Sequence, residues 1–157
     1  MRKAPAGGSI DGCMAQGLDQ DSLEAFAERW WAAWNAHDGE AVSALCTEDV
    51  RNDGPALGRE IRGREEIAAY VKTFAQAFPD LRFVIPEPPY ASLTQAKAIV
   101  PWRFEGTHDG EFAPMGLAPT GNRLEMDGVD HWWFRDGLVQ RRSMVYDFAQ
   151  VLRALRS

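Results

Sequence analysis

The sequence has few of the residues from which metal sites, disulfide frameworks and phosphate loops are built. Its 157 residues include two cysteines, Cys13 and Cys46, and three dispersed histidines, none of them at the spacing of metal ligands. No glycine-rich phosphate loop is present, and no serine lies in a nucleophile-elbow motif. These absences exclude the common signatures of zinc sites, nucleotide-binding loops and serine hydrolases, and we expect neither a metal nor a cofactor.

Long apolar runs and clusters of basic residues are also missing. No segment approaches the ~18 consecutive apolar residues that a membrane-spanning helix needs, and no apolar run of signal-peptide length follows the positive N-terminus. The formal net charge is -6, and Arg141-Arg142 is too short to follow a phosphate backbone. We therefore expect a cytoplasmic protein whose partners include no nucleic acid and no membrane.

The sequence is instead rich in hydrophobic residues, at 45%, and it has six tryptophans. This composition suits a single globular domain, expected over 21–157, behind a disordered N-terminal tail over 1–20 that is rich in glycine, alanine and serine. Concentrated aromatic residues either pack a core or line a pocket for an apolar ligand, and both readings stay open here. Five of the tryptophans fall in two segments: Trp30, Trp31, Trp34, Trp132 and Trp133.

Helical spacing precedes strand alternation along the chain. Apolar residues recur three and four apart in three segments, over about 22–35, 41–45 and 64–77. The period then changes to two over 81–85, 96–105, 123–135 and 138–146. A short strand over 50–53 and a short helix from Phe148 complete the prediction, and Asp21 or Ser22 is expected to cap the first helix. This order indicates an α+β fold in which helices cover one face of a curved antiparallel sheet and leave a pocket between the layers.

Asp130 is the acid that most needs an explanation. In a strand its side chain shares a face with Trp132 and Phe134, whereas His131 points to the other face. Apolar surroundings favour the neutral form of a carboxyl group, and a neutral acid can donate a hydrogen bond to a developing enolate oxygen. We therefore expect a protonated, cavity-facing Asp130. The alternative is a structural acid that is bonded to an arginine or to backbone.

Asp53 is the second candidate, at the end of the short strand and directly before Gly54-Pro55. A carboxylate at this place could remove a proton from a carbon next to a carbonyl group and return it nearby. The alternative is an aspartate that stabilises a turn, which is common beside Gly-Pro.

Six short segments occur together and in a characteristic order: Trp34-Asn35-Ala36-His37-Asp38, Gly63-Arg64-Glu65-Glu66-Ile67, Ala77-Phe78-Pro79-Asp80-Leu81, Gly106-Thr107-His108, Pro119-Thr120-Gly121 and Phe134-Arg135-Asp136-Gly137. With them the chain resembles the nuclear transport factor 2-like superfamily, and within it the SnoaL-like polyketide cyclases and the ketosteroid isomerases. The resemblance implies a cone-shaped sheet with three helices over its concave face. It also implies a homodimer formed through the outer sheet face, with His131 and Trp133 in the interface.

The resemblance also implies roles for single residues. Asp130 stands where the isomerases have their hydrogen-bond-donating acid, and Asp53 stands at the place of their proton-shuttling base. Two positions depart from the family pattern: Trp30 replaces a tyrosine of the isomerases, and Met144 replaces an aspartate that the cyclases and epoxide hydrolases use. Asn52 or Tyr146 could supply a compensating polar group.

We thus predict a cofactor-independent acid/base enzyme, of the cyclase, isomerase or dehydratase type, with Asp53 and Asp130 as catalytic residues. Its substrate is expected to be a small, mostly apolar, carbonyl-bearing molecule that is polyketide-like or steroid-like. The alternatives are a non-catalytic dimeric module that binds a small ligand, an epoxide hydrolase-like enzyme, and a purely structural role. The residues expected to bind substrate are Trp30, Trp34, Tyr70, Trp102, Trp132, Phe134, Met144 and Tyr146.

Overall fold

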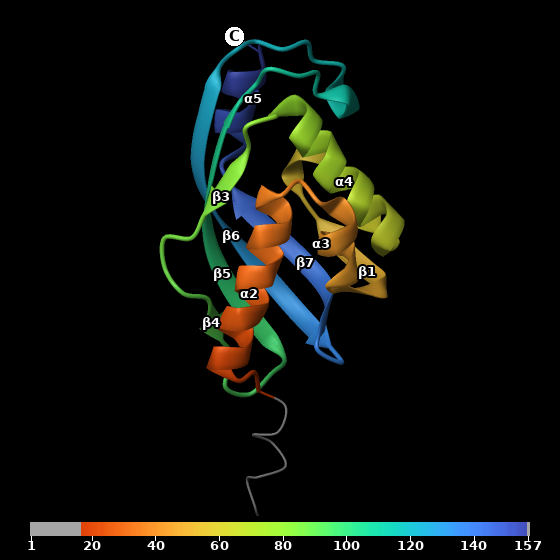
Figure 1. Cartoon of the computed structure of the whole chain (residues 1–157), viewed down its shortest axis with the longest axis vertical. Helices are drawn as coiled ribbons and strands as arrows, with labels where there is room; N and C mark the ends of the chain where they lie inside the picture. Colours follow the sequence, from red (N-terminus) through yellow and green to blue (C-terminus); the bar gives the residue numbers. More distant parts are fainter. Residues whose placement is uncertain (1–16, 157) are drawn as a thin grey trace, which may run out of the picture.

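The computed structural model describes residues 17–156, and its first half contains three α-helices (Figure 1). They are α2 (Gln20–Asn35), α3 (Gly39–Ala44) and α4 (Gly63–Ala77). The cap of α2 differs from the expected one, because the Asp19 carboxylate accepts the bond from the Ser22 backbone N–H at 2.9 Å. Most of the expected tail lies outside the described residues, but the Leu18 N–H donates to the Ser92 carbonyl oxygen.

Seven strands and a last helix make up the rest of the fold. They are β1 (Cys46–Asp53), β2 (Glu60–Arg62), β3 (Arg82–Val84), β4 (Tyr90–Ala91), β5 (Lys97–Thr107), β6 (Arg123–Arg135), β7 (Leu138–Tyr146) and α5 (Phe148–Arg156). The sheet order is β2-β1-β7-β6-β5-β3, and β4 pairs with β5. β6 and β7 have the predicted bounds, whereas β1 begins at Cys46 rather than Val50.

One pair of strands corrects the expectation of an antiparallel sheet. β1 runs parallel to β7, with Asn52 opposite Arg142 in the register. A parallel pair needs a long connection between its strands, and the chain from β2 to β6 provides it here. The result is a mixed sheet in which side chains of β1 and β7 stand next to each other on the same face.

The helices α2, α3 and α4 cover one face of the curved sheet (Figure 1), and α5 packs beside β6. The core lies between these two layers, where Trp30, Trp34 and Trp132 are almost completely buried. The ring centroids of Trp30 and Trp132 are 5.0 Å apart, so tryptophans from α2 and β6 pack directly on each other. None of the helices in the described part of the chain is long and apolar enough to cross a membrane.

Candidate functional site

Asp130 is the centre of a buried hydrogen-bond network on the concave face of the sheet. Its Oδ1 accepts from the Trp102 indole N–H at 2.8 Å. Its Oδ2 accepts from the Trp132 indole N–H at 3.1 Å and from Nε–H of Arg142 at 2.5 Å. Gly128 makes room for this network, because a Cβ atom there would clash with the Trp102 ring.

These contacts correct the expectation of a neutral, cavity-facing Asp130. Both of its oxygens face N–H donors, and the proton of a neutral acid would need an acceptor that these partners do not offer. The geometry fits a carboxylate paired with an arginine, which is the alternative reading of the sequence. Burial lowers the pKa of Arg142. The charge of Asp130 and its hydrogen bond, together with Tyr70 and Cys46, outweigh burial, so the pKa lies above its ordinary value. Asp130 therefore orients Arg142.

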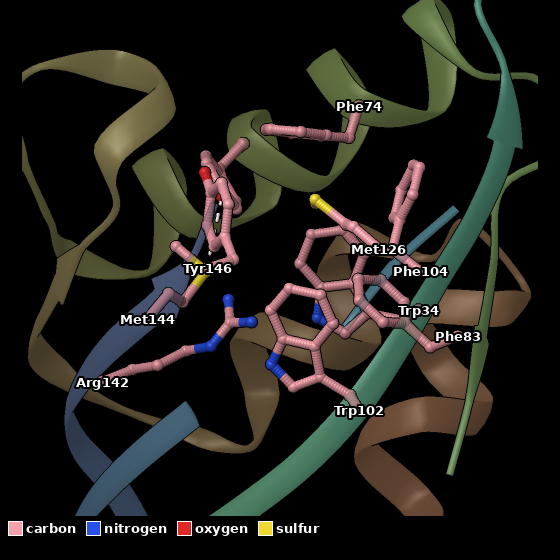
Figure 2. A pocket seen from close by; sticks show the side chains of 10 residues that line it. Trp34, Phe74, Phe83, Trp102, Phe104, Met126, Arg142, Met144 and Tyr146 are labelled. Atoms are coloured by element: carbon pink, nitrogen blue, oxygen red, sulfur yellow. Dashed lines mark hydrogen bonds between the residues drawn. The ribbon is translucent and has the colours of Figure 1, made fainter. Parts of the chain in front are cut away.

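Arg142 presents its free nitrogens to an apolar cavity. Figure 2 shows the two terminal nitrogens of its guanidinium pointing into the space between the aromatic side chains. The Cζ atom lies 5.5 Å and 5.7 Å from the ring centroids of Trp30 and Trp34, which hold the guanidinium between them and Asp130. No residue in 17–156 accepts a hydrogen bond from the terminal nitrogens, so they are available to a ligand oxygen.

The cavity itself has a volume of about 20 Å³, which is room for about one water molecule. Among the residues that the structure describes, no carboxylate lines it. Its wall is aromatic and apolar apart from Arg142 and two tyrosine hydroxyls. The lining residues are Trp34, Tyr70, Phe74, Phe83, Trp102, Phe104, Met126, Arg142, Met144 and Tyr146.

The two tyrosines of the cavity wall are hydrogen-bond donors. Burial raises the pKa of Tyr146 to about 12 and the pKa of Tyr70 further above its usual range. The Tyr70 hydroxyl donates to Sδ of Met144 at 3.6 Å. The Tyr146 oxygen accepts from the Ala56 N–H at 3.2 Å, and its own proton has no acceptor within the described chain. Tyr146 can therefore donate to a ligand beside Arg142.

Met144 separates this cavity from a groove on the outside of the molecule. The groove has a volume of about 360 Å³, and Met144 lines both spaces. Gly54 is at the contact, because a Cβ atom there would collide with the terminal methyl group of Met144. The outer groove is lined by Asp53, Gly54, Pro55, Gly58, Arg59 and Met144. A flexible side chain thus lies between the outer groove and the inner cavity.

Asp53 lies at the outer groove and not at the cavity. Its carboxylate accepts from a terminal nitrogen of Arg141 at 3.0 Å, and its side chain is 37% exposed. The sequence interpretation required Asp53 and Asp130 to line one cavity, and the structure does not bring them together in this way. A catalytic role for Asp53 stays a prediction.

The predicted substrate-binding residues divide into two groups. Trp34, Tyr70, Trp102, Met144 and Tyr146 line the cavity. Trp30, Trp132 and Phe134 instead pack with Phe26 in the core between α2 and β6. Contact between any of them and a substrate stays a prediction. Within 17–156, no three His, Cys, Asp or Glu side chains converge as a metal ion requires.

Arg142 is the residue that the sequence interpretation missed. The sequence analysis considered Arg141-Arg142 only as a possible basic patch, for which the pair is too short. The signal was the alternation over 141–145 in β7, where Arg142 and Met144 are buried and Arg141 and Val145 are exposed. A buried arginine on a strand beside a buried aspartate predicts an ion pair, because an unpaired charge is costly in the core.

Comparison with known proteins agrees with this fold. The SnoaL-like domain family matches residues 27–142. No curated protein matches the chain.

Three solved structures share the architecture. TsrD from Streptomyces laurentii is 24% identical, with a TM-score of 0.75 over 88% of this chain and 98% of that one. A proposed SnoaL-like polyketide cyclase from Jannaschia sp. CCS1 is 20% identical, with a TM-score of 0.75 over 90% of this chain and 99% of that one. The third is a protein of ketosteroid isomerase-like fold from Catenulispora acidiphila DSM 44928, in complex with trimethylamine. It is 18% identical, with a TM-score of 0.69 over 83% of this chain and 91% of that one.

Proposed function

The chain belongs to the SnoaL-like domain family, and we propose that it is a cofactor-independent enzyme acting on a small, mostly apolar carbonyl compound. The observation that carries this proposal is the guanidinium of Arg142. Its terminal nitrogens face an apolar cavity and have no acceptor among residues 17–156. A substrate carbonyl oxygen at this place accepts hydrogen bonds from Arg142 and Tyr146. Fixed donors in a dry cavity stabilise the negative charge of an enolate.

In this proposal Arg142 takes the electrophilic role that the sequence assigned to Asp130. Asp53 remains the base, because it is the carboxylate that borders the groove leading to Met144. Its ion pair with Arg141 is partly exposed, and separating such a pair costs about 1 kcal/mol or less. Asp53 can therefore leave Arg141 and reach a substrate that enters past Met144.

Movement of Met144 is required, because a cavity of about 20 Å³ does not hold an organic molecule. Its unbranched side chain has several accessible rotamers and little strain to overcome. Once it turns away, the inner cavity and the outer groove become one space with Arg142 at its inner end and Asp53 at its mouth. A carbonyl group at Arg142 then has its neighbouring carbon directed toward the groove. Removal and return of a proton there would serve isomerisation, dehydration or ring closure.

A second candidate is a non-catalytic module that binds a small apolar ligand. The lack of any carboxylate on the cavity wall, among the described residues, favours it. Such a module uses Arg142 and Tyr146 to hold a ligand oxygen and needs no base.

The experiment that tests the enzyme is proton exchange. We expect the protein to accelerate exchange of the α-protons of small cyclic ketones and enones in deuterium oxide, followed by NMR. The variant Asp53→Asn should lose this acceleration by about 100-fold or more, since general base catalysis contributes 10²–10⁴-fold. Asp49→Asn is the matched control. Asp49 also lies in β1 and is paired with an arginine, Arg135 of β6, but it is not a lining residue of the groove. If the acceleration of exchange persists in Asp53→Asn, or if the wild type shows no acceleration, the proposal of an acid/base enzyme is contradicted.

We also propose that the chain forms a homodimer through the convex face of the sheet. Val145 is 69% exposed there and Ile99 is 38% exposed, and His131 stacks on Trp133 with ring centroids 3.7 Å apart. An exposed apolar patch of this kind is typical of an interaction surface. Sedimentation velocity at micromolar concentration tests it: a dimer that the variant Val145→Asp converts to monomer is expected, and a monomeric wild type contradicts it.

A further inference from the structure

One buried amide, in the strand that pairs with the strand of Arg142, has no hydrogen bond among the described residues. Asn52 in β1 is completely buried, and neither its side-chain nitrogen nor its side-chain oxygen has a partner in the part of the chain that the structure describes. Leaving a buried amide unbonded costs about 1–3 kcal/mol. Native proteins keep few such groups, and those that remain often bond water or a ligand. Asn52 is not part of the network that holds Asp130.

The position of Asn52 connects it to the guanidinium of the proposed site. Asn52 and Arg142 are opposite each other in the parallel register of β1 and β7, and both side chains are buried on the concave face. The indole N–H groups of Trp30 and Trp34 are likewise without an acceptor among residues 17–156, and these rings flank the same guanidinium. Several unbonded polar groups therefore gather around Arg142.

These groups define which chemistry complements them. Arg142 and the two indoles can only donate hydrogen bonds, whereas the Asn52 oxygen can only accept one. A ligand that satisfies both kinds offers an acceptor oxygen to Arg142 and a hydroxyl proton to Asn52. It also carries no charge, because Arg142 is already neutralised by Asp130, and a further carboxylate would be an unpaired charge in an apolar cavity.

We infer that the ligand of this site is a neutral hydroxycarbonyl compound. Its carbonyl oxygen accepts from Arg142, and its hydroxyl group, on a nearby carbon, bonds the Asn52 amide. Asn52 is then the residue that determines specificity for the hydroxyl group. This inference rests on the proposed function for the placement of the carbonyl oxygen at Arg142.

Three matched probes test the inference: 4-hydroxy-4-methylpentan-2-one, its deoxy analogue 4-methylpentan-2-one, and 3-methylbutanoate. Each is titrated into the wild-type protein while the indole N–H signals of the tryptophans are followed by NMR. We expect the hydroxyketone to bind about 10-fold more tightly than the ketone, which corresponds to about one hydrogen bond. The carboxylate should bind most weakly of the three.

The variant Asn52→Leu removes both amide functions at similar volume. In this variant the preference for the hydroxyketone should fall to about 1, while the affinity for the ketone changes less than 2-fold. Its urea unfolding should show no loss of stability, because the variant removes a buried amide that has no hydrogen bond. Arg51→Gln is the control, since Arg51 is exposed in the same strand and faces away from the cavity.

Two results overturn the inference. One is equal affinity of the wild type for hydroxyketone and ketone, including no binding of either at millimolar concentration. The other is an equal loss for both probes in Asn52→Leu. Failure of the proposed function looks different: a hydroxyl preference that depends on Asn52, without any Asp53-dependent proton exchange, refutes only the acid/base enzyme. Asp53-dependent exchange without a hydroxyl preference refutes only this inference.

Discussion

Two adjacent arginines of β7 each pair with an aspartate, on opposite faces of the sheet. Arg142 bonds Asp130 on the concave face, where the two side chains are 3% and 0% exposed. Arg141 bonds Asp53 near solvent, where they are 45% and 37% exposed. The convex pair also lies beside Trp133, since Arg141 is 4.6 Å from the centroid of that ring. The same two residue types thus form a pair in two different environments, although the two arginines are adjacent in the chain.

The difference supports the separate tasks that we propose for the two aspartates. In the buried pair, loss of one partner leaves an uncompensated charge in the core, so the pair stays together and fixes the direction of Arg142. In the exposed pair, water replaces a lost partner at little cost. Asp130 therefore serves the architecture of the site, whereas Asp53 is free to contact another molecule.

The largest effect is expected when the buried pair is broken. Asp130→Asn keeps the shape of the side chain but leaves the Arg142 charge without a counterion in the core. We expect a loss of about 3–5 kcal/mol in the free energy of unfolding, measured with urea. Asp127→Asn is the control, because Asp127 lies in the same strand and pairs with Arg103 at the surface. A loss in Asp130→Asn as small as the one in the control would mean that the buried pair is not ionic.

A double-mutant cycle sharpens this comparison. Arg142→Met added to Asp130→Leu removes the orphaned charge, so the double variant should regain about 2 kcal/mol or more relative to Asp130→Leu alone. It should not reach the wild type, because the indole N–H groups of Trp102 and Trp132 remain without an acceptor. Urea unfolding of the four proteins gives the coupling free energy. If the losses of stability in the two single variants simply add in the double variant, a direct interaction between Asp130 and Arg142 is contradicted.

The smallest effect on stability is expected at the exposed pair. Asp53→Asn should change the free energy of unfolding by about 1 kcal/mol or less, and added sodium chloride should reduce the difference further. The same variant is expected to have a large effect on proton exchange. A large loss of stability in Asp53→Asn would show that this pair is structural as well, and would remove the contrast between the two faces.

Most of the fold could be predicted from periodicity. The strands β6 and β7 and the helices α2 and α4 have long, regular patterns of buried residues, so their existence and type follow from the sequence. The parallel pairing of β1 with β7 could not be predicted in this way. Periodicity shows which face of a strand is buried, but it does not show which strand lies beside it.

The same limit applies to the site. Alternation placed Asp130 with Trp132 on the concave face, and both are buried there. The register that sets Asp130 opposite Met144, within reach of Arg142, depends on the bulge and the turn between β6 and β7. A sequence-based reading without that register assigned the acid to a cavity that it does not line. The contact with Arg142, which the sequence alone does not reveal, is what identifies Asp130 as a member of an ion pair.

The parallel contact between β1 and β7 also has a consequence for the order of folding. β6 and β7 form a hairpin through a two-residue turn at Asp136-Gly137, and such local contacts form early. The contact of Asn52 with β7 joins distant parts of the chain, and closing so long a loop is entropically slow. We therefore expect the ion pair of the hairpin to be in place before β1 docks, so the ligand pocket is completed in the last stage of folding.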